Sequence, residues 1–160
     1  MDERNKQLTL IVFSNDMDRA IAAFILATGA ASAGMNVTMY FTFWGLALLR
    51  KKEYAARGKG FIELMFGWML PKGPEGAHLS KMHFLGAGTS LMKRVMRTKK
   101  IPQLADLMDM AVSLDVKFIA CSTSMGMMGI TREELIDSIE IGGVATYLGE
   151  ARESAVNLFI

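Results

Sequence analysis

No charged residue occurs between Ala20 and Leu49, and this uncharged stretch is the strongest constraint on the fold. A stretch of this length must be tested as a membrane span. Polar residues interrupt it, however, and Gly34 to Asn36 divides it into a first half with helical periodicity and a second half with strand character. The stretch therefore predicts a buried helix followed by a buried parallel strand, rather than a segment that crosses a membrane.

Short β-prone apolar runs alternate with helical patterns along the rest of the chain. Strands are expected at residues 8–13, 36–42, 116–120 and 144–148. Helices are expected from Met17, after Phe43, over 91–100, from Pro102 and over 150–158, and Thr131 to Glu134 reads as a capping box. This order predicts a single domain, residues 1–160, with a three-layer α/β/α architecture and a mostly parallel sheet of about five strands.

The composition argues against several classes of protein. The net charge of +2 is close to neutral, which argues against nucleic acid as a partner. The chain has one cysteine, so it cannot form an internal disulfide bond. Residues 1–7 are polar and charged, and they lack the apolar core of a signal peptide. We therefore expect a cytoplasmic protein.

Residues 61–70 form a second apolar segment, with the sequence FIELMFGWML. The segment is too short to span a bilayer, and it is apolar on nearly every side. Segments of this kind usually pack against a neighbouring element, another subunit or a membrane surface. We expect an identical subunit to cover it, which predicts a homo-oligomer without a membrane span.

The only cysteine, Cys121, directly follows the predicted strand at residues 116–120 and precedes a run of small polar residues. That run comprises Ser122, Thr123, Ser124, Met125 and Gly126. Backbone amides that point at a sulfur atom favour the reactive thiolate over the thiol. The carboxyl edge of a parallel sheet is also where ligands bind. A free cysteine is nevertheless often only a small buried hydrophobe, and both interpretations stay open at this point.

Other strand ends should meet Cys121 at the same edge of the sheet. Asn15 follows the first predicted strand, and Thr42 and Trp44 follow the second. Together these residues predict a pocket with one nucleophile, amide donors and an aromatic wall. No Ser-His-Asp set is identifiable, and we expect neither a metal nor a cofactor.

Two further patterns point to other chemistry, and both are weak. The Gly86-x-Gly88 pattern lacks the third glycine of a dinucleotide fingerprint, so a tight turn is favoured over a nucleotide site. Met125, Met127 and Met128 lie close to Cys121 in sequence, and thioethers with a thiolate can hold Cu(I). Methionine is also the adaptable filler of apolar interiors, which is the favoured interpretation here.

Five segments, in order and over nearly the whole chain, resemble the DsrE/DsrF-like sulfur-relay family. The resemblance is closest to its longer branch, whose members also occur fused to rhodanese and disulfide-reductase modules. The matching segments are residues 11–18 (IVFSNDMD), 30–38 with AASAGM and VT, 41–46 (FTFWGL), 121–129 (CSTSMGMMG) and 142–145 (GGVA). The segment at residues 41–46 is the most specific of them.

The resemblance implies a cytoplasmic α/β homo-oligomer that carries sulfane sulfur as a persulfide on Cys121 and passes it to a partner protein. The amides of residues 122–126 would stabilise the anion, and Met125 and Trp44 would shield it from water. Because the chain has no second cysteine, the thiol that resolves the persulfide must come from elsewhere. The rival hypotheses are a ligand-binding or regulatory module with an inert Cys121, and a Cu(I) carrier.

Overall fold

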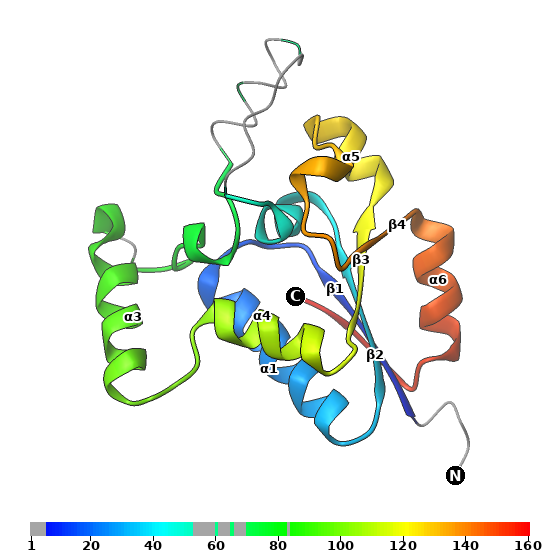
Figure 1. Ribbon diagram of the computed structural model, residues 1–160, viewed down its shortest axis with the longest axis horizontal. Coiled ribbons are helices and arrows are strands. Elements are labelled where there is room, and N and C mark those ends of the chain that lie inside the picture. Colours follow the sequence, from blue (N-terminus) through cyan, green and yellow to red (C-terminus); the bar gives the residue numbers. More distant parts are fainter. Residues whose placement is uncertain (1–5, 53–59, 61–64, 66–69, 83) are drawn as a thin grey trace.

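The computed structural model describes residues 6–52, 60, 65, 70–82 and 84–160, and five parallel strands form one sheet within them (Figure 1). The spatial order of the strands is β4-β3-β2-β1-β5. Their bounds are β1 Gln7–Val12, β2 Asn36–Phe41, β3 Lys117–Cys121, β4 Glu140–Gly142 and β5 Val156–Phe159. The predicted three-layer α/β/α architecture with a parallel sheet is confirmed.

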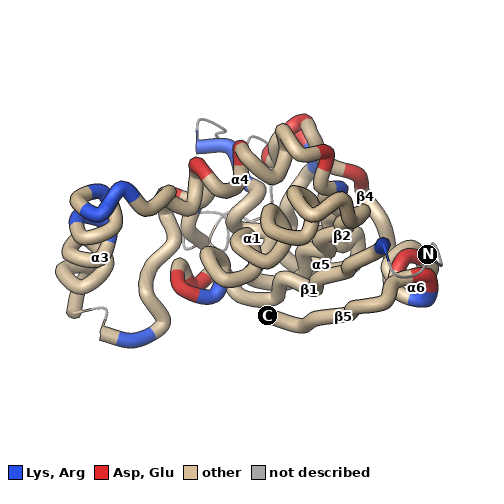
Figure 2. The backbone as a smooth tube through the Cα atoms, turned by 90° about the horizontal axis from the view of Figure 1, so that it is seen from below, with Lys and Arg blue, Asp and Glu red and all other residues tan. Residues whose placement is uncertain are grey.

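Helices connect the strands and cover both faces of the sheet. Their bounds are α1 Met17–Ser32, α3 Ala87–Thr98, α4 Leu104–Ser113, α5 Ser122–Met128 and α6 Val144–Glu153. Short 3₁₀ helices occupy η2 Phe43–Leu49, η3 Pro74–Gly76, η4 Phe84–Gly86 and η5 Arg132–Glu134. In the view of Figure 2, α1 and α4 lie above strands β1 and β5, and α3 stands apart from the sheet.

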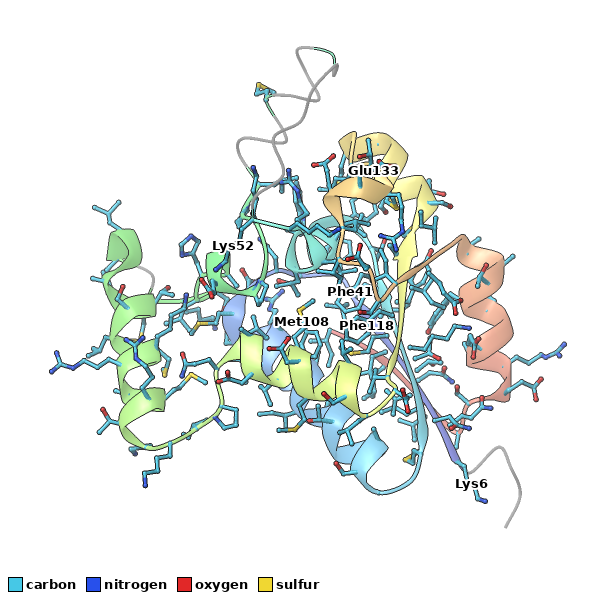
Figure 3. The ribbon with its side chains drawn as sticks, viewed as in Figure 1. Lys6, Phe41, Lys52, Met108, Phe118 and Glu133 are labelled. Carbon is cyan, nitrogen blue, oxygen red and sulfur yellow. The ribbon has the colours of Figure 1, made fainter. Side chains whose placement is uncertain are left out.

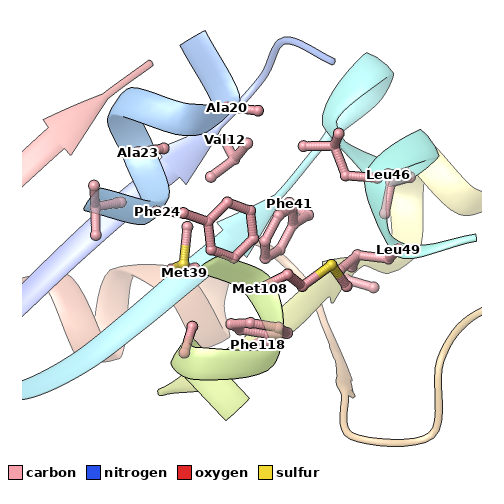
Figure 4. Close-up of a cluster of buried hydrophobic side chains, with 14 of the residues drawn as sticks. Val12, Ala20, Ala23, Phe24, Met39, Phe41, Leu46, Leu49, Met108 and Phe118 are labelled. Atoms are coloured by element: carbon pink, nitrogen blue, oxygen red, sulfur yellow. The ribbon is translucent and has the colours of Figure 1, made fainter. Parts of the chain in front are cut away.

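The main core lies between the sheet and the pair α1 and α4. Phe24 on α1 contacts Phe41 on β2 and Phe118 on β3, with ring centroids 6.2 and 5.9 Å apart (Figure 4). Met108 on α4 packs in the same core, near Phe41 and Phe118 (Figure 3). Each large side chain buried here contributes about 1.5–3 kcal/mol. Burial therefore explains why residues 20–49 carry no charge, because α1 and β2 both contribute side chains to this core.

The opposite face of the sheet carries a smaller cluster under α6. Tyr40 of β2 and Ile119 and Cys121 of β3 are buried there against Tyr147 of α6. Side chains on a strand alternate between faces, so Tyr40 points away from the main core while its neighbour Phe41 points into it. The cysteine therefore belongs to the α6 side of the molecule.

The secondary structure predicted for the C-terminal region was wrong. Residues 144–148 are not a strand but the start of α6, and residues 150–158 are not one helix but the end of α6 followed by β5. Tyr147 and Ala151 are one helical turn apart and both pack on the Tyr40 cluster, which holds this segment helical. β5 instead completes the sheet by pairing with β1, from Leu8 with Val156 to Ile11 with Phe159.

Smaller differences concern the elements after β2 and near α4. The segment after Thr42 is a 3₁₀ helix, and Arg50 does not end an α-helix but forms a buried ion pair with Glu134, 3.0 Å long. The predicted capping box at Thr131 is present, although it caps only the short η5. Pro102 lies outside α4, whose N-cap is Gln103.

The prediction of a subunit interface at residues 61–70 falls mostly outside the described residues. Positions 61–64 and 66–69 are not described, whereas Met65 is exposed and Leu70 is buried. Among the helices that the structure describes, none combines the length and the apolar character needed to cross a membrane.

Candidate functional site

Cys121 is the last residue of β3 and the N-cap of α5, so the chain passes directly from strand to helix at the sulfur atom. The residue is 7% exposed. In the sheet it pairs with Gly142, where β4 ends. The predicted location at the carboxyl edge of a parallel sheet is thus the location found.

Four hydrogen-bond donors surround the Cys121 sulfur. The hydroxyl and the backbone amide of Ser124 approach it from α5, the hydroxyls of Tyr40 and Thr42 approach it from β2 and the residue that follows it, and all of them lower its pKa. The Thr42 and Ser124 hydroxyl oxygens are themselves 2.8 Å apart. The sulfur therefore sits among donors that can all stabilise a negative charge.

The balance of these effects favours the thiolate. Burial raises the pKa of Cys121, because a charge is poorly solvated there, and the Ser124, Tyr40 and Thr42 donors lower it. The net result is a Cys121 pKa of about 7, below the ordinary value of 9.0. Burial and the neighbouring sulfur raise the pKa of Tyr40, so its hydroxyl keeps the proton that it donates. A large share of the sulfur is thus ionised near neutral pH.

The alternation of strand residues explains why these groups converge. Tyr40 is the register partner of Ile119, and Phe41 pairs with Ala120, so Tyr40 and Cys121 lie on the same face of the sheet. Thr42 lies two residues beyond Tyr40 and shares that face. Tyr40 was not among the residues predicted for the site. The sequence signal that could have found it is its position two residues before Thr42, because residues two apart on a strand lie on the same face.

The structure brings together only some of the predicted site residues. Thr42 and Ser124 lie close enough to the sulfur to lower its pKa. Ser122, Thr123 and Gly126 lie on the exposed side of α5. Asn15 is half-buried in the loop after β1.

The apolar surroundings of the sulfur differ from the expected ones. Met125 packs in the main core, and Trp44 on η2 is 42% exposed. The apolar groups packed beside Cys121 are Tyr40, Ile119 and Tyr147, with the two tyrosine rings 5.1 Å apart. Tyr147 comes from the segment predicted to be a strand, which is why sequence reasoning missed it.

The methionines near Cys121 in sequence are placed apart from its sulfur. Within the described part of the chain, no group of three or more His, Cys, Asp and Glu side chains is placed to hold a metal ion. Met125 and Met128 are both used in the main core, on the other side of the sheet from the Cys121 cluster, and Met127 is exposed. Met125 and Met128 are therefore packing residues of the main core.

Comparison with known proteins places this geometry in a family. The DsrE/DsrF/DrsH-like family matches residues 4–159, nearly the whole chain. The chain belongs to this family. Its relatives include the uncharacterized protein YrkE of Bacillus subtilis, which is 45% identical over 160 residues and covers 100% of both chains. Another is the sulfur carrier protein DsrE2 of Allochromatium vinosum, 32% identical, with 97% of this chain and 98% of the relative covered.

Two solved structures share the fold of this chain at much lower identity. The ychN protein from E. coli has a TM-score of 0.57 at 9% identity and covers 97% of this chain and 99% of its own. A protein of unknown function, MTH1491 from Methanobacterium thermoautotrophicum, has a TM-score of 0.55 at 12% identity, with 96% and 99% covered. At these identities the likeness concerns the fold alone.

The hydrogen bonds to the sulfur predict a shifted titration of Cys121. The rate of alkylation by iodoacetamide follows the thiolate fraction, so it should rise with pH to half its maximum at pH about 7. Ser124→Ala removes a hydroxyl donor from the thiolate and should move this midpoint upward by about one pH unit. Ser122→Ala, the same change at an exposed position of α5, should leave the midpoint in place. A wild-type midpoint near 9, or equal midpoints in all three proteins, would contradict the assignment of the donors.

Proposed function

We propose that this protein is a sulfur carrier that holds sulfane sulfur as a persulfide on Cys121. The observation that carries the proposal is a buried thiol with a pKa of about 7, lowered by the polar groups of Ser124, Tyr40 and Thr42 around it. Membership of the DsrE/DsrF/DrsH-like family, and a relative whose name is sulfur carrier protein, support a role in sulfur relay in general.

The transfer needs no change of overall redox state. The Cys121 thiolate attacks the outer sulfur of a donor persulfide, a new S–S bond forms at Cys121, and the donor sulfur leaves as a thiolate with the electron pair of the broken bond. In the second step an acceptor thiolate attacks the outer sulfur on Cys121 in the same way. Cys121 returns as the thiolate, so no external oxidant or reductant is consumed.

The hydroxyl donors suit an anion that changes size during this cycle. A hydroxyl hydrogen rotates to follow its acceptor, so Thr42, Ser124 and Tyr40 can redirect from the thiolate to the terminal sulfur of the persulfide. The tyrosine rings exclude water from one side of the sulfur, which protects a persulfide from hydrolysis and oxidation. No side chain in this set is needed as a general acid or base.

The partners that we propose are a sulfur donor, a sulfur acceptor and further copies of this chain. The chain has a single cysteine, so the acceptor thiol belongs to another molecule. Exposed aromatic side chains lie beside the sulfur-bearing edge: Phe43, Trp44 and Phe159, with Phe13 packed against two of them at centroid distances of 5.4 and 5.7 Å. We refer to these four residues as the aromatic rim. They form an apolar surface next to Thr42, suited to the contact of a homo-oligomer or a relay partner.

Intact-mass spectrometry tests the proposal directly. Wild-type protein incubated with polysulfide, without reducing agent, should gain mass in one-sulfur steps. After removal of the polysulfide, addition of a small thiol should remove the added mass and release one equivalent of sulfide. Protein that gains no mass, or whose added mass a thiol does not remove, would contradict a carrier role and favour an inert cysteine.

A further inference from the structure

Helix α3 carries an apolar side and a cationic side. Leu91 and Val95 project from the same side of the helix and are exposed, with 64% of Leu91 accessible. Lys93 and Arg97 occupy the opposite side, because residues on a helix advance by about 100° each. Thr89 and Met96 are the buried residues of α3 and attach it to the rest of the molecule. The apolar side is therefore free of this attachment.

The segment before α3 extends the apolar side into a groove of about 440 Å³. The groove is lined by Leu79, Met82, Phe84, Ala87, Gly88, Leu91, Met92 and Val95. At its end Leu85 is 104% exposed, which means that the side chain contacts essentially nothing in the molecule. Exposed apolar side chains gathered in this way mark an interaction surface. We call these side chains, together with Leu85, the α3 apolar face.

Along the sequence the charges of α3 and its flanking residues have one sign, although Glu75 lies against Lys93 in the structure. Residues 76–105 contain six of the 18 Lys and Arg residues of the chain and none of its 16 Asp and Glu residues. The rest of the chain therefore carries 12 cationic against 16 anionic side chains. Figure 2 shows blue segments on and beside α3 and red segments over α4, while α6 carries both colours. The six cations are Lys81, Lys93, Arg94, Arg97, Lys99 and Lys100.

We propose that the α3 apolar face binds the surface of a membrane that contains anionic lipids. Helix α3 lies in the plane of the interface, with Leu85 and Leu91 among the outer parts of the acyl chains and Arg94 and Lys99 at the lipid phosphates. A helix with an apolar side, a cationic side and low average hydrophobicity is typical of such interfacial helices. The protein is then a peripheral membrane protein, whether or not Cys121 carries sulfur.

Two other occupants of this surface are less compatible with its charge and shape. A second copy docked on the same face would bring the cations that flank this face, such as Arg94 and Lys99, toward their counterparts, which costs energy at every close approach. A partner protein would need an acidic surface that also fills the groove. A bilayer supplies both features at once, since its phosphates and its acyl chains lie in adjacent layers.

Vesicle sedimentation with the full-length protein tests the proposal. The protein should pellet with vesicles of phosphatidylcholine and about one-third phosphatidylglycerol at ~0.1 M salt, and should remain in solution with phosphatidylcholine alone or at ~1 M salt. Cys121→Ser should pellet as wild type does, because the surface is separate from the sulfur site. This result also separates a failure of the membrane proposal from a failure of the carrier proposal.

Two double variants assign the binding to α3. Arg94→Gln with Lys99→Gln removes two cations and should weaken binding about thirtyfold, about fivefold for each charge. Leu91→Gln with Val95→Gln leaves the charge unchanged and should weaken binding by about a hundredfold, since two buried apolar side chains are lost. The charge-matched control is Arg19→Gln with Arg152→Gln, exposed cations outside the α3 surface, and it should change binding little.

Several outcomes would overturn the proposal. The first is protein that does not pellet with the anionic vesicles, and the second is binding that the control weakens as much as the α3 variants do. Sedimentation velocity distinguishes the remaining occupants. A loss of mass in the Leu91→Gln, Val95→Gln variant without vesicle binding would assign the face to a second copy. An unchanged mass without vesicle binding would leave the face to a partner protein.

Discussion

Cys121→Ser is expected to abolish sulfur loading completely while the protein remains folded. The wild-type sulfur is ionised to about half near neutral pH, because its pKa is about 7. The serine hydroxyl does not ionise in this range and cannot form a persulfide. Serine nevertheless has nearly the shape of cysteine, and its hydroxyl can replace the sulfur in hydrogen bonds to Thr42 and Ser124. Intact mass after polysulfide treatment measures the loss, and near-ultraviolet circular dichroism confirms the fold.

A relocated cysteine gives the matched control for this result. Ser113→Cys in the Cys121→Ser background places one thiol on the exposed end of α4, away from the donors at the sheet edge. An ordinary exposed thiol is only a few per cent ionised at pH 7, so it should load sulfur about tenfold more slowly than Cys121. Equal loading rates for the two positions would mean that the site around Cys121 adds nothing to the reactivity of a free thiol.

Gly45→Ala is expected to destabilise the protein by about 3 kcal/mol or more. A Cβ atom at this position would lie 2.1 Å from the Val12 carbonyl oxygen and 2.9 Å from its carbonyl carbon. Both are backbone atoms of β1, so no side-chain rotation relieves the clash. The backbone amide of Gly45 also donates to the Phe13 carbonyl over 2.9 Å, which fixes η2 against the end of β1. Chemical denaturation followed by circular dichroism measures the change.

The same variant should also affect the sulfur site. Displacement of η2 moves Thr42, whose amide donates to the Val12 carbonyl over 3.1 Å and whose hydroxyl lowers the pKa of Cys121. The alkylation midpoint of any folded Gly45→Ala protein should therefore rise. Gly29→Ala is the control, since this exposed helical glycine of α1 has open space where the Cβ would lie. It should stabilise the protein by up to about 1 kcal/mol. Similar effects of the two substitutions would contradict the close approach at Gly45.

The candidate site could be predicted in its position but not in its full membership. The location of Cys121 follows from a local pattern, an apolar run that ends in small polar residues. Thr42 and Ser124 were predicted because each lies at or beside a strand end. Tyr40 lies inside a strand, and its role depends on the pairing of β2 with β3, which brings it onto the face that Cys121 shares. Tyr147 depends further on the packing of α6 over that face.

The sequence by itself determined the alternation of apolar runs, and with it the parallel sheet, the burial of α1 and β2 and the place of the cysteine at a strand end. These features depend on the spacing of residues within single elements, because the periodicity of apolar residues shows which side of an element is buried. Only the tertiary structure decided the last two elements. Residues 144–148 are β-prone, yet they form a helix because Tyr147 and Ala151 pack on the Tyr40 cluster. Residues 156–159 form a strand because they pair with the edge of β1. Contacts of this kind outweigh local propensity, because a vacant sheet edge and an uncovered apolar face both cost more free energy than a less favoured backbone conformation.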